Sequence, residues 1–532
     1  MSERAAALTE PAHGILVGTT NAGPLGRVDG AGALVGVDGG WRLDWWVGAD
    51  DRWHVPIEET AVRQRLVDAM PVVETAMRVP TGDVVAPAYG ARIGGLADDL
   101  VALELANDST LPVAVALVLS GRSEVVLDGS TATVDGSVVL RLPRPPSRAA
   151  AGAVVAEVRD AVESGAADEV SAPVRGRVVA LLVPLAHTAR LRASLTVSTP
   201  GAREVAEAPS GPVADPPEAD QVARGWRSQL DRGAAVRLPD ERIGEAVDQA
   251  RAQLLLAAAA PFDPSPTATL AALTTVLTQQ GFAEEARRVA AVLVERQRLN
   301  GRFARGADAL AVTIAAVTGL AAFGRLAGGD VAEALMGPLA KAAHRIARDD
   351  PSLTTDGAVG AVVATADLLR GAGQDDAAAA LLARLPGDAD GRGPVTPLDE
   401  VLAEPDGPEP GTAVDRAVAV LGPVRTGLVD DAPGARGGAS LRLFAGFPTT
   451  WLGQGVEVHE APTRFGHLSC AVRWHGERPA LLWDLDAGAD GPPPGLVLTS
   501  PALDPTWSST EPRGEALLAA PAGTPPVEGS FS

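Results

Sequence analysis

The chain has 532 residues, a formal net charge of −22 and a single cysteine. This length suffices for two or three domains, each with its own hydrophobic core. The negative charge argues against binding to nucleic acid or to anionic membrane surfaces, and the lone Cys470 excludes intramolecular disulfides and metal sites built from cysteines.

The N-terminal residues contain no apolar stretch of signal-peptide length, and no run is expected to reach the length of a membrane span. The histidines show no metal-ligand spacing. Walker loops, dinucleotide-binding glycine motifs and nucleophilic serine elbows are missing from the sequence. We therefore expect a soluble, cytoplasmic protein with no metal and no cofactor. The sequence does not indicate an oligomeric state.

Residues 1–205 show the pattern of a β-sandwich domain. Short apolar runs, for example Val101–Ala106 and Val113–Leu119, are separated by Gly, Asp, Asn and Pro at intervals of roughly 8–12 residues. The segment Ala149–Gly165 is compatible with a helix or with a strand.

Four tryptophans lie close together in this domain, between Trp41 and Trp53. In an extended segment Trp45 and Trp46 point to opposite sides, so one can enter the core while the other faces a ligand or another domain. Two interpretations remain open. The segment is either a hydrophobic plug between domains, or a loop that offers Trp53 as a stacking platform for a ligand and Asp51 as a polar contact.

Residues 206–220 are rich in Pro, Ala and acidic residues and are predicted to be a linker. Residues 221–435 read as a series of helical hairpins, clearest up to Leu385. The segment Phe282–Gln297 carries an apolar stripe with spacings of three and four, whereas Ala309–Phe323 is apolar almost all round. Alternation of half-buried and fully buried helices predicts two concentric layers, as in an (α/α) helical toroid.

Strand patterns return in residues 436–532, which we interpret as a small C-terminal β module. Arg473–Asp486 is predicted to form a hairpin, with its turn at His475–Pro479. Cys470 lies in an apolar run just before it and is predicted to be buried. The predicted fold class is therefore multidomain α+β: an N-terminal β-sandwich, a central toroid and a C-terminal β module.

This order of domains resembles the six-hairpin, (α/α)6-toroid glycosidase superfamily of actinobacterial type. The resemblance is carried by Gln279–Phe303, in which Gln297, Gly301 and Phe303 match a Gln-x-x-x-Gly-x-Phe pattern common in such proteins. It is also carried by Val72–Asp83, Arg473–Asp486 and Ser500–Leu517. It implies a carbohydrate or glycoconjugate ligand and a pair of carboxylates in the mouth of the toroid.

Cleavage of a glycosidic bond needs one protonated carboxylic acid and a second carboxylate that activates water or acts as nucleophile. The long turns 261–266, 298–308 and 348–357 follow alternate helices, so they share one face, which we expect to bind the ligand. The predicted catalytic residues on this face are Asp350, Asp263 and Asp356; the predicted substrate-binding residues are Arg302, Arg305, Trp53 and Asp51.

Asp350 is the preferred acid because Asp349 and the end of the preceding helix dipole should both raise its pKa. Asp356 or Asp263 would then be the base. Each of these residues also has a structural interpretation. Asp263, Asp356 and Asp308 stand where helix N-caps are expected, and Asp349 with Asp350 could form a solvated helix end.

The resemblance and the residues leave two hypotheses about function. The first is a glycoside hydrolase acting by carboxylate acid/base catalysis. The second is a catalytically degenerate toroid that serves as a carbohydrate-binding or scaffold module. The second is favoured by the lack of Trp and Tyr between Arg242 and Leu385, and by the run of small residues Gly357–Leu369.

Overall fold

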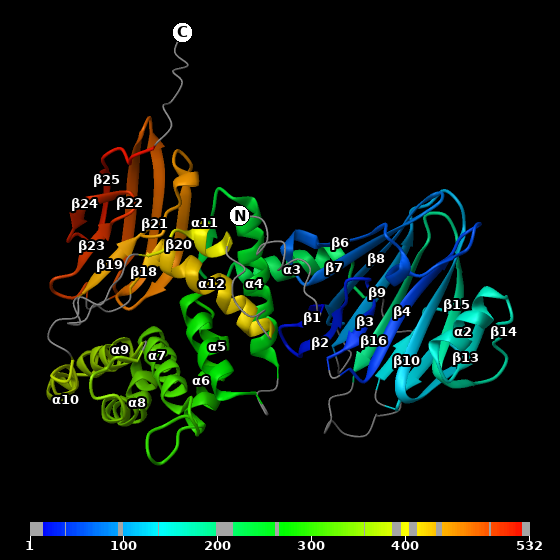
Figure 1. Cartoon of the computed structure of the whole chain (residues 1–532), viewed down its shortest axis with the longest axis horizontal. Coiled ribbons are helices and arrows are strands. Elements are labelled where there is room, and N and C mark those ends of the chain that lie inside the picture. Colours follow the sequence, from blue (N-terminus) through cyan, green and yellow to red (C-terminus); the bar gives the residue numbers. More distant parts are fainter. Residues whose placement is uncertain are drawn as a thin grey trace, which may run out of the picture. The chain divides into compact units, whose positions relative to one another are not determined.

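The computed structural model describes residues 14–37, 39–93, 99–136, 138–197, 216–260, 265–355, 357–385, 395–403, 412–431, 439–488 and 491–523 (Figure 1). The chain divides into two compact units. The sandwich unit comprises Ala7–Ser228 with Leu255–Ala260. The helical unit comprises Gln229–Leu254 and Pro261–Ser532, and it holds both the helices and the C-terminal strands. Most of the predicted linker, residues 206–215, lies outside the described residues.

The predicted β-sandwich is confirmed. One large antiparallel sheet folds around a shared core in the order β1-β2-β3-β4-β10-β11-β12-β16-β9-β8-β7-β6. The ambiguous segment 149–165 contains both a strand and a helix. The elements are β1 Ile15–Thr19, β2 Gly23–Val28, β3 Leu34–Gly36, β4 Trp41–Gly48, β5 Trp53–His54, η1 Pro56–Glu58, β6 Val62–Leu66, η2 Val67–Ala69, β7 Val72–Val79, β8 Gly82–Ala91, β9 Leu100–Asn107, β10 Val113–Asp128, β11 Thr131–Val134, β12 Val138–Arg141, β13 Arg148–Gly152, α2 Val155–Glu163, β14 Asp168–Glu169, β15 Val174–Leu185, β16 Arg190–Val197 and α3 Ala219–Leu230.

The tryptophans of β4 fill two separate hydrophobic clusters of the sandwich unit. Trp41 and Trp45 enter the main core, and the indole Nε1 of Trp45 donates to the carbonyl of Gly32 at 3.2 Å. Trp46 points to the other side of the strand and belongs to a second cluster, which also contains Val158 of α2 and Ala180 of β15. The opposite orientation of Trp45 and Trp46 is thus confirmed. Both side chains are buried within the sandwich unit itself.

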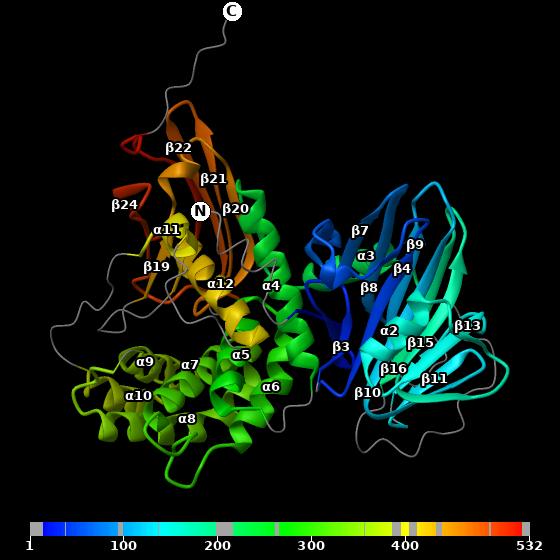
Figure 2. The ribbon, with the colours of Figure 1, turned by 45° about the vertical axis from the view of Figure 1, so that its right-hand side comes forward.

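Two layers of helices build the helical unit (Figure 2). The nearly all-apolar helices α5, α7 and α9 contact one another in succession, and α12 packs against α5. The amphipathic helices α6 and α8 and the short α10 pack on their outer side. The two predicted layers of an (α/α) toroid are therefore present. The helices are α4 Glu241–Ala259, α5 Thr267–Gln279, α6 Ala283–Glu295, α7 Ala309–Ala327, α8 Gly329–Asp349, α9 Ala358–Gly371, α10 Asp375–Leu382, α11 Leu398–Ala403 and α12 Ala413–Leu428.

Helix α7 corrects one expectation from the sequence. Its 19 residues are long and apolar enough to cross a membrane by length and composition, although no run of that kind was expected. The structure gives a physical reason for this composition: α7 contacts α5, α6, α8 and α9. A helix covered on several sides needs apolar residues around its whole circumference.

The Gln297–Phe303 pattern has a structural explanation in the turn after α6. The side-chain amide of Gln297 donates to the carbonyl of Pro338 in α8 at 2.8 Å. Gly301 has a φ of 87°, and Phe303 is buried.

Asp308 occupies the predicted N-cap position of α7, but its side chain makes no capping hydrogen bond. The predicted cap at Asp308 is therefore wrong, and Asp356 lies outside the described residues.

The C-terminal β module consists of two small sheets, with strand orders β17-β20-β21-β22-β25 and β18-β19-β23-β24. The predicted hairpin is confirmed: β21 pairs with β22, and His475 lies opposite Arg478 at the turn. Cys470 in β21 is buried as predicted, and burial raises the pKa of its thiol to about 12. The elements are β17 Ala235–Arg237, β18 Val429–Asp430, β19 Ser440–Leu443, η3 Thr449–Trp451, β20 Val456–Thr463, β21 Gly466–His475, β22 Arg478–Asp486, β23 Val497–Ser500, β24 Asp504–Ser509 and β25 Arg513–Leu517.

Candidate functional site

Asp350, the predicted general acid, ends α8 and stabilises the turn that follows it. Its carboxylate accepts a hydrogen bond of 2.6 Å from the backbone N–H of Thr355 and one of 3.3 Å from the hydroxyl of Thr354. These bonds, the first above all, hold the pKa of Asp350 below its ordinary value. The prediction of a raised pKa is therefore wrong, because hydrogen-bond donors within the turn outweigh the helix dipole and the neighbouring charge. Asp263 and Asp356 lie outside the described residues.

The neighbouring Asp349 is held by two arginines. Arg302 and Arg345 each donate to its carboxylate, with N–O distances of 2.7 Å. Burial alone would raise the pKa of Asp349, but the hydrogen bonds from Arg345 and Arg302 lower it below the ordinary value. The guanidinium of Arg302 is thus occupied by a carboxylate of the chain itself. Arg305 is exposed on the same loop.

The lowered pKa values at the end of α8 predict how this turn responds to acid. A carboxyl group with a depressed pKa in the folded state stabilises the fold above its unfolded pKa of about 3.9, and this contribution is lost as the pH falls through the folded value. Asp350→Asn should therefore lower the melting temperature at pH 7 and have little effect near pH 2. Melting curves between pH 2 and pH 7 test this, with exposed Asp376→Asn in α10 as control. An equal effect at both ends of the range would contradict it.

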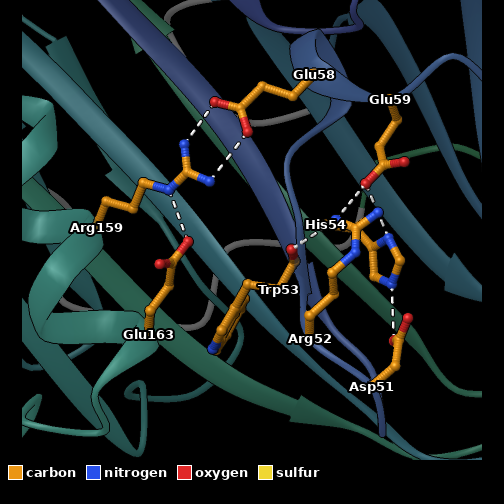
Figure 3. Close-up of polar contacts among 8 residues, drawn as sticks. All are labelled: Asp51, Arg52, Trp53, His54, Glu58, Glu59, Arg159 and Glu163. Carbon is orange, nitrogen blue, oxygen red and sulfur yellow. Dashed lines mark hydrogen bonds and ion pairs between the residues drawn. The ribbon is translucent and has the colours of Figure 1, made fainter.

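Asp51 and Trp53 lie beside a buried histidine in the sandwich unit (Figure 3). The two ring nitrogens of His54 face Asp51 and Glu59, each at 2.9 Å. The hydrogen bond from His54 lowers the pKa of Asp51. The indole of Trp53 packs on Gly48, where an added Cβ would lie 3.0 Å from the ring. Both side chains have partners inside this unit, and their contact with a ligand stays a prediction.

A hollow of about 1510 Å³ opens in the helical unit, at the ends of the helices opposite the long loops 298–308 and 348–357. Its walls are the end of α7, the start of α8, the end of α9, the turn between β20 and β21, and the segment after β22. It therefore lies at the short turn 327–330 rather than at the long loops that the sequence pointed to. Its side chains with charged, imidazole or aromatic groups are Arg325, Asp330, Glu333, Asp367, Arg370, Arg464, Phe465, His467 and Asp486.

Arg464, in the β20–β21 turn, places a buried positive charge in the wall of the hollow. Its side chain is only 5% exposed, and its Nη2 lies 2.7 Å from the carboxylate of Asp367 in α9. The guanidinium also lies over the ring of Phe465, 4.7 Å from the ring centroid. This pair connects the C-terminal β module to the inner helical layer, because its two partners come from those two parts.

Two further arginines belong to the same buried network. Arg325, in the last turn of α7, donates to the carbonyl of Ala364 at 3.2 Å, and burial lowers its pKa. Arg425 of α12 donates to the carbonyl of Pro462 at 2.8 Å and pairs with Asp431 at 3.2 Å. The backbone N–H of Arg464 donates to the other oxygen of Asp431 at 2.7 Å.

Three buried donors of this network have no partner among the described residues: Nε of Arg325, Nε of Arg425 and Nη1 of Arg464. A buried donor without a hydrogen bond is costly, so such groups mark places where a ligand or ion can add binding energy. Towards solvent, the rim of the hollow carries the exposed Asp330, Glu333, Arg370 and Asp486.

Sequence reasoning did not single out this site. Arg464 and Asp367 are distant in the chain, and only the packing of the β20–β21 turn on α9 brings them together. One signal was present in the sequence, since Arg325 is the sole charged residue in the otherwise apolar α7. A charge in a helix that is covered on several sides requires a partner or a function.

No family model matches this chain, and no curated protein matches it in sequence. Among solved structures it is similar to a bacterial glucoamylase complexed with acarbose, with a TM-score of 0.50 and 10% identity over 71% of this chain. Two family GH92 glycosidases also match: an inverting mannosidase from Bacteroides thetaiotaomicron (10% identity, TM-score 0.37, 65% of this chain and 54% of that chain) and a second glycosyl hydrolase (11%, 0.31, 71% and 63%).

The similarity to the glucoamylase establishes the class of fold. This chain shares the fold of that glucoamylase, with an N-terminal β-sandwich and a helical region in two layers, as the resemblance in the sequence implied. The match spans 66% of the glucoamylase chain, slightly less than two thirds of its length. At 10% identity the similarity concerns the fold alone.

Proposed function

We propose that this chain binds a carbohydrate in the hollow between α7, α8, α9 and the β20–β21 turn. The observation that carries the proposal is the lining of the hollow: exposed carboxylates and guanidinium groups beside the half-buried ring of Phe465. Carboxylates accept hydrogen bonds from sugar hydroxyl groups and arginines donate to sugar oxygens, and such charge-assisted bonds are the stronger kind. The shared architecture with a glucoamylase, whose structure holds acarbose, supports the same ligand class.

Calorimetric titration of the full chain with acarbose and with maltohexaose tests binding at this place. Asp330 in the first turn of α8 and Glu333 three residues later are both exposed. The double variant Asp330→Asn, Glu333→Gln should therefore weaken binding about tenfold or more, because each acceptor loses its charge. The matched control is Asp376→Asn, in the exposed first turn of α10, where the affinity should not change. Equal affinities of the double variant and the wild type would place the ligand elsewhere.

Hydrolysis of a glycosidic bond is the second candidate function. The hollow contains four carboxylates, Asp330, Glu333, Asp367 and Asp486. They favour this function because glycoside hydrolysis uses one carboxyl group as acid and a second one as base or nucleophile. Loss of a catalytic acid or base typically lowers turnover by about 10²–10⁴. Assaying the same variants on a glycoside panel distinguishes catalysis from binding. Turnover that instead depends on Asp350, with Asp356 or Asp263 as base, would locate catalysis at the long-loop face.

A further inference from the structure

We propose that the hollow recognises an anionic sugar, with a phosphate or carboxylate group held between Arg325, Arg464 and the N-terminus of α8. This inference rests on the proposed carbohydrate binding, and it adds the chemical class of the ligand. It is carried by an excess of buried cationic groups, by unpartnered donors and by open space at the start of α8.

The buried network of described residues contains more positive than negative groups. Arg325, Arg425 and Arg464 lie near two carboxylates, Asp367 and Asp431. Each carboxylate already has two partners, because Asp367 also pairs with the exposed Arg370 and Asp431 accepts from Arg425 and from the backbone of Arg464. Arg464 and Arg425 each pair directly with one of these carboxylates, whereas Asp367 and Asp431 attract the charge of Arg325 without a direct ion pair. A charge that is largely removed from water and only partly compensated is unfavourable unless a further opposite charge comes close. An anionic group in the hollow would supply that charge.

The donors that such a group needs lie on the hollow side of the network. Arg325 and Arg464 both line the hollow, and each has a buried N–H without a partner among the described residues. Arg464 is more than nine-tenths buried, so its planar guanidinium is fixed in position by Asp367 and Phe465. A fixed guanidinium is well suited to phosphate and carboxylate oxygens.

The start of α8 adds backbone donors at the same place. Helix α8 has 21 residues, and its N-cap Gly328 makes no side-chain capping bond. Gly328 and Gly329 have φ values of 60° and 50°, and a Cβ added to either would meet nothing within 4 Å. The first turn of α8 therefore lines the hollow and is uncovered at these two glycines. A long helix concentrates partial positive charge at its N-terminus, which favours an anion.

The acidic side chains of the rim restrict the ligand further. Asp330 lies in the first turn of α8, Glu333 follows three residues later, and Asp486 ends β22. These groups repel a ligand that is anionic over its whole surface, but they accept hydrogen bonds from hydroxyl groups. A sugar with one anionic substituent satisfies both requirements: its charged group is directed to the buried arginines and its hydroxyl groups to the rim.

Titration of the full chain with four probes tests this inference: glucose 6-phosphate, glucuronate, glucose and inorganic phosphate. We expect at least one of the two anionic sugars to bind about tenfold or more tightly than glucose, and its affinity to fall as NaCl is raised from 50 mM to 500 mM. The stronger of the two identifies the phosphate or the carboxylate as the preferred group.

Arg325→Met is the decisive variant. It should abolish the preference for the anionic sugar and leave the melting temperature without ligand unchanged or higher, since a buried charge without a direct pair is removed. Arg287→Met on the exposed face of α6 is the control and should preserve the preference. A marked loss of stability in Arg325→Met with the preference retained would show a structural role and overturn the inference.

The outcomes separate this inference from the proposed function. If glucose and the anionic sugars bind equally, carbohydrate binding stands and the anion site fails. If phosphate binds through Arg325 but no sugar does, the anion site stands and the proposed function fails. If none of the four probes binds, both fail.

Discussion

Asp367→Ala is expected to lower the free energy of unfolding of the helical unit by about 3 kcal/mol. Removal of one partner of a buried ion pair costs about 3–5 kcal/mol, because the remaining charge stays buried without compensation. The lower end applies here because the side chain of Asp367 is 18% exposed while that of Arg464 is 5% exposed. Denaturant unfolding of the full chain, followed by circular dichroism, measures the loss.

A matched surface pair provides the control for this substitution. Glu284 and Arg287 of α6 are 3.7 Å apart and largely exposed, so Glu284→Ala should cost less than about 0.5 kcal/mol. The double variant Asp367→Leu, Arg464→Met should recover most of the stability, since apolar side chains can replace a buried ion pair. If Asp367→Ala lowers the free energy of unfolding no more than Glu284→Ala does, the Asp367–Arg464 ion pair does not stabilise the contact between α9 and the β20–β21 turn.

Trp45→Ala should have a comparable effect on the sandwich unit, with a loss of about 3–5 kcal/mol. Trp45 is 1% exposed and anchored by its hydrogen bond to Gly32, so its removal leaves a large cavity and an unpaired carbonyl. Trp53→Ala, which removes a half-buried ring, should cost about 1–2 kcal/mol. Scanning calorimetry of the full chain can follow the transition of this unit. An unchanged transition in Trp45→Ala would mean that the ring is not part of the sandwich core.

The comparison of these two tryptophans also tests why they cluster in the sequence. The sequence left open whether the segment is a plug between domains or a ligand platform. Trp45 and Trp46 pack on opposite sides of β4, in two different hydrophobic clusters. These consecutive tryptophans are therefore explained by a strand that has a hydrophobic core on each face. A strand buried on both faces requires large apolar residues at consecutive positions.

Local patterns predicted much of the fold. The apolar α7 and the amphipathic α6 have the periodicities that separate an inner from an outer helical layer, and the alternating strands predicted the sandwich. The pairing of distant strands could not be predicted in this way. β17, which precedes the helices, pairs with β20, which follows them, and no local signal connects Ala235 with His459.

The candidate site was harder to predict than the fold. The acids favoured from the sequence lie on long loops. In the structure, Asp349 forms ion pairs with Arg302 and Arg345, and Asp350 accepts hydrogen bonds from Thr354 and Thr355. The groups of the hollow come from three helices, the β20–β21 turn and the segment at the end of β22, and their proximity depends on how these elements pack. Charge and helix-end rules describe a single element, whereas a pKa depends on every donor that the tertiary fold brings near.

The pairing of β17 with β20 has a consequence for synthesis on the ribosome. Ala235–Arg237 are made before every helix of the two layers, yet their hydrogen-bonding partners Glu457–His459 appear more than two hundred residues later. Contacts of such long sequence separation form slowly, and an unpaired strand edge invites association with other chains. The nascent helical unit must therefore remain incomplete until β20 emerges, and its yield in cells should depend on chaperones that cover this edge during translation.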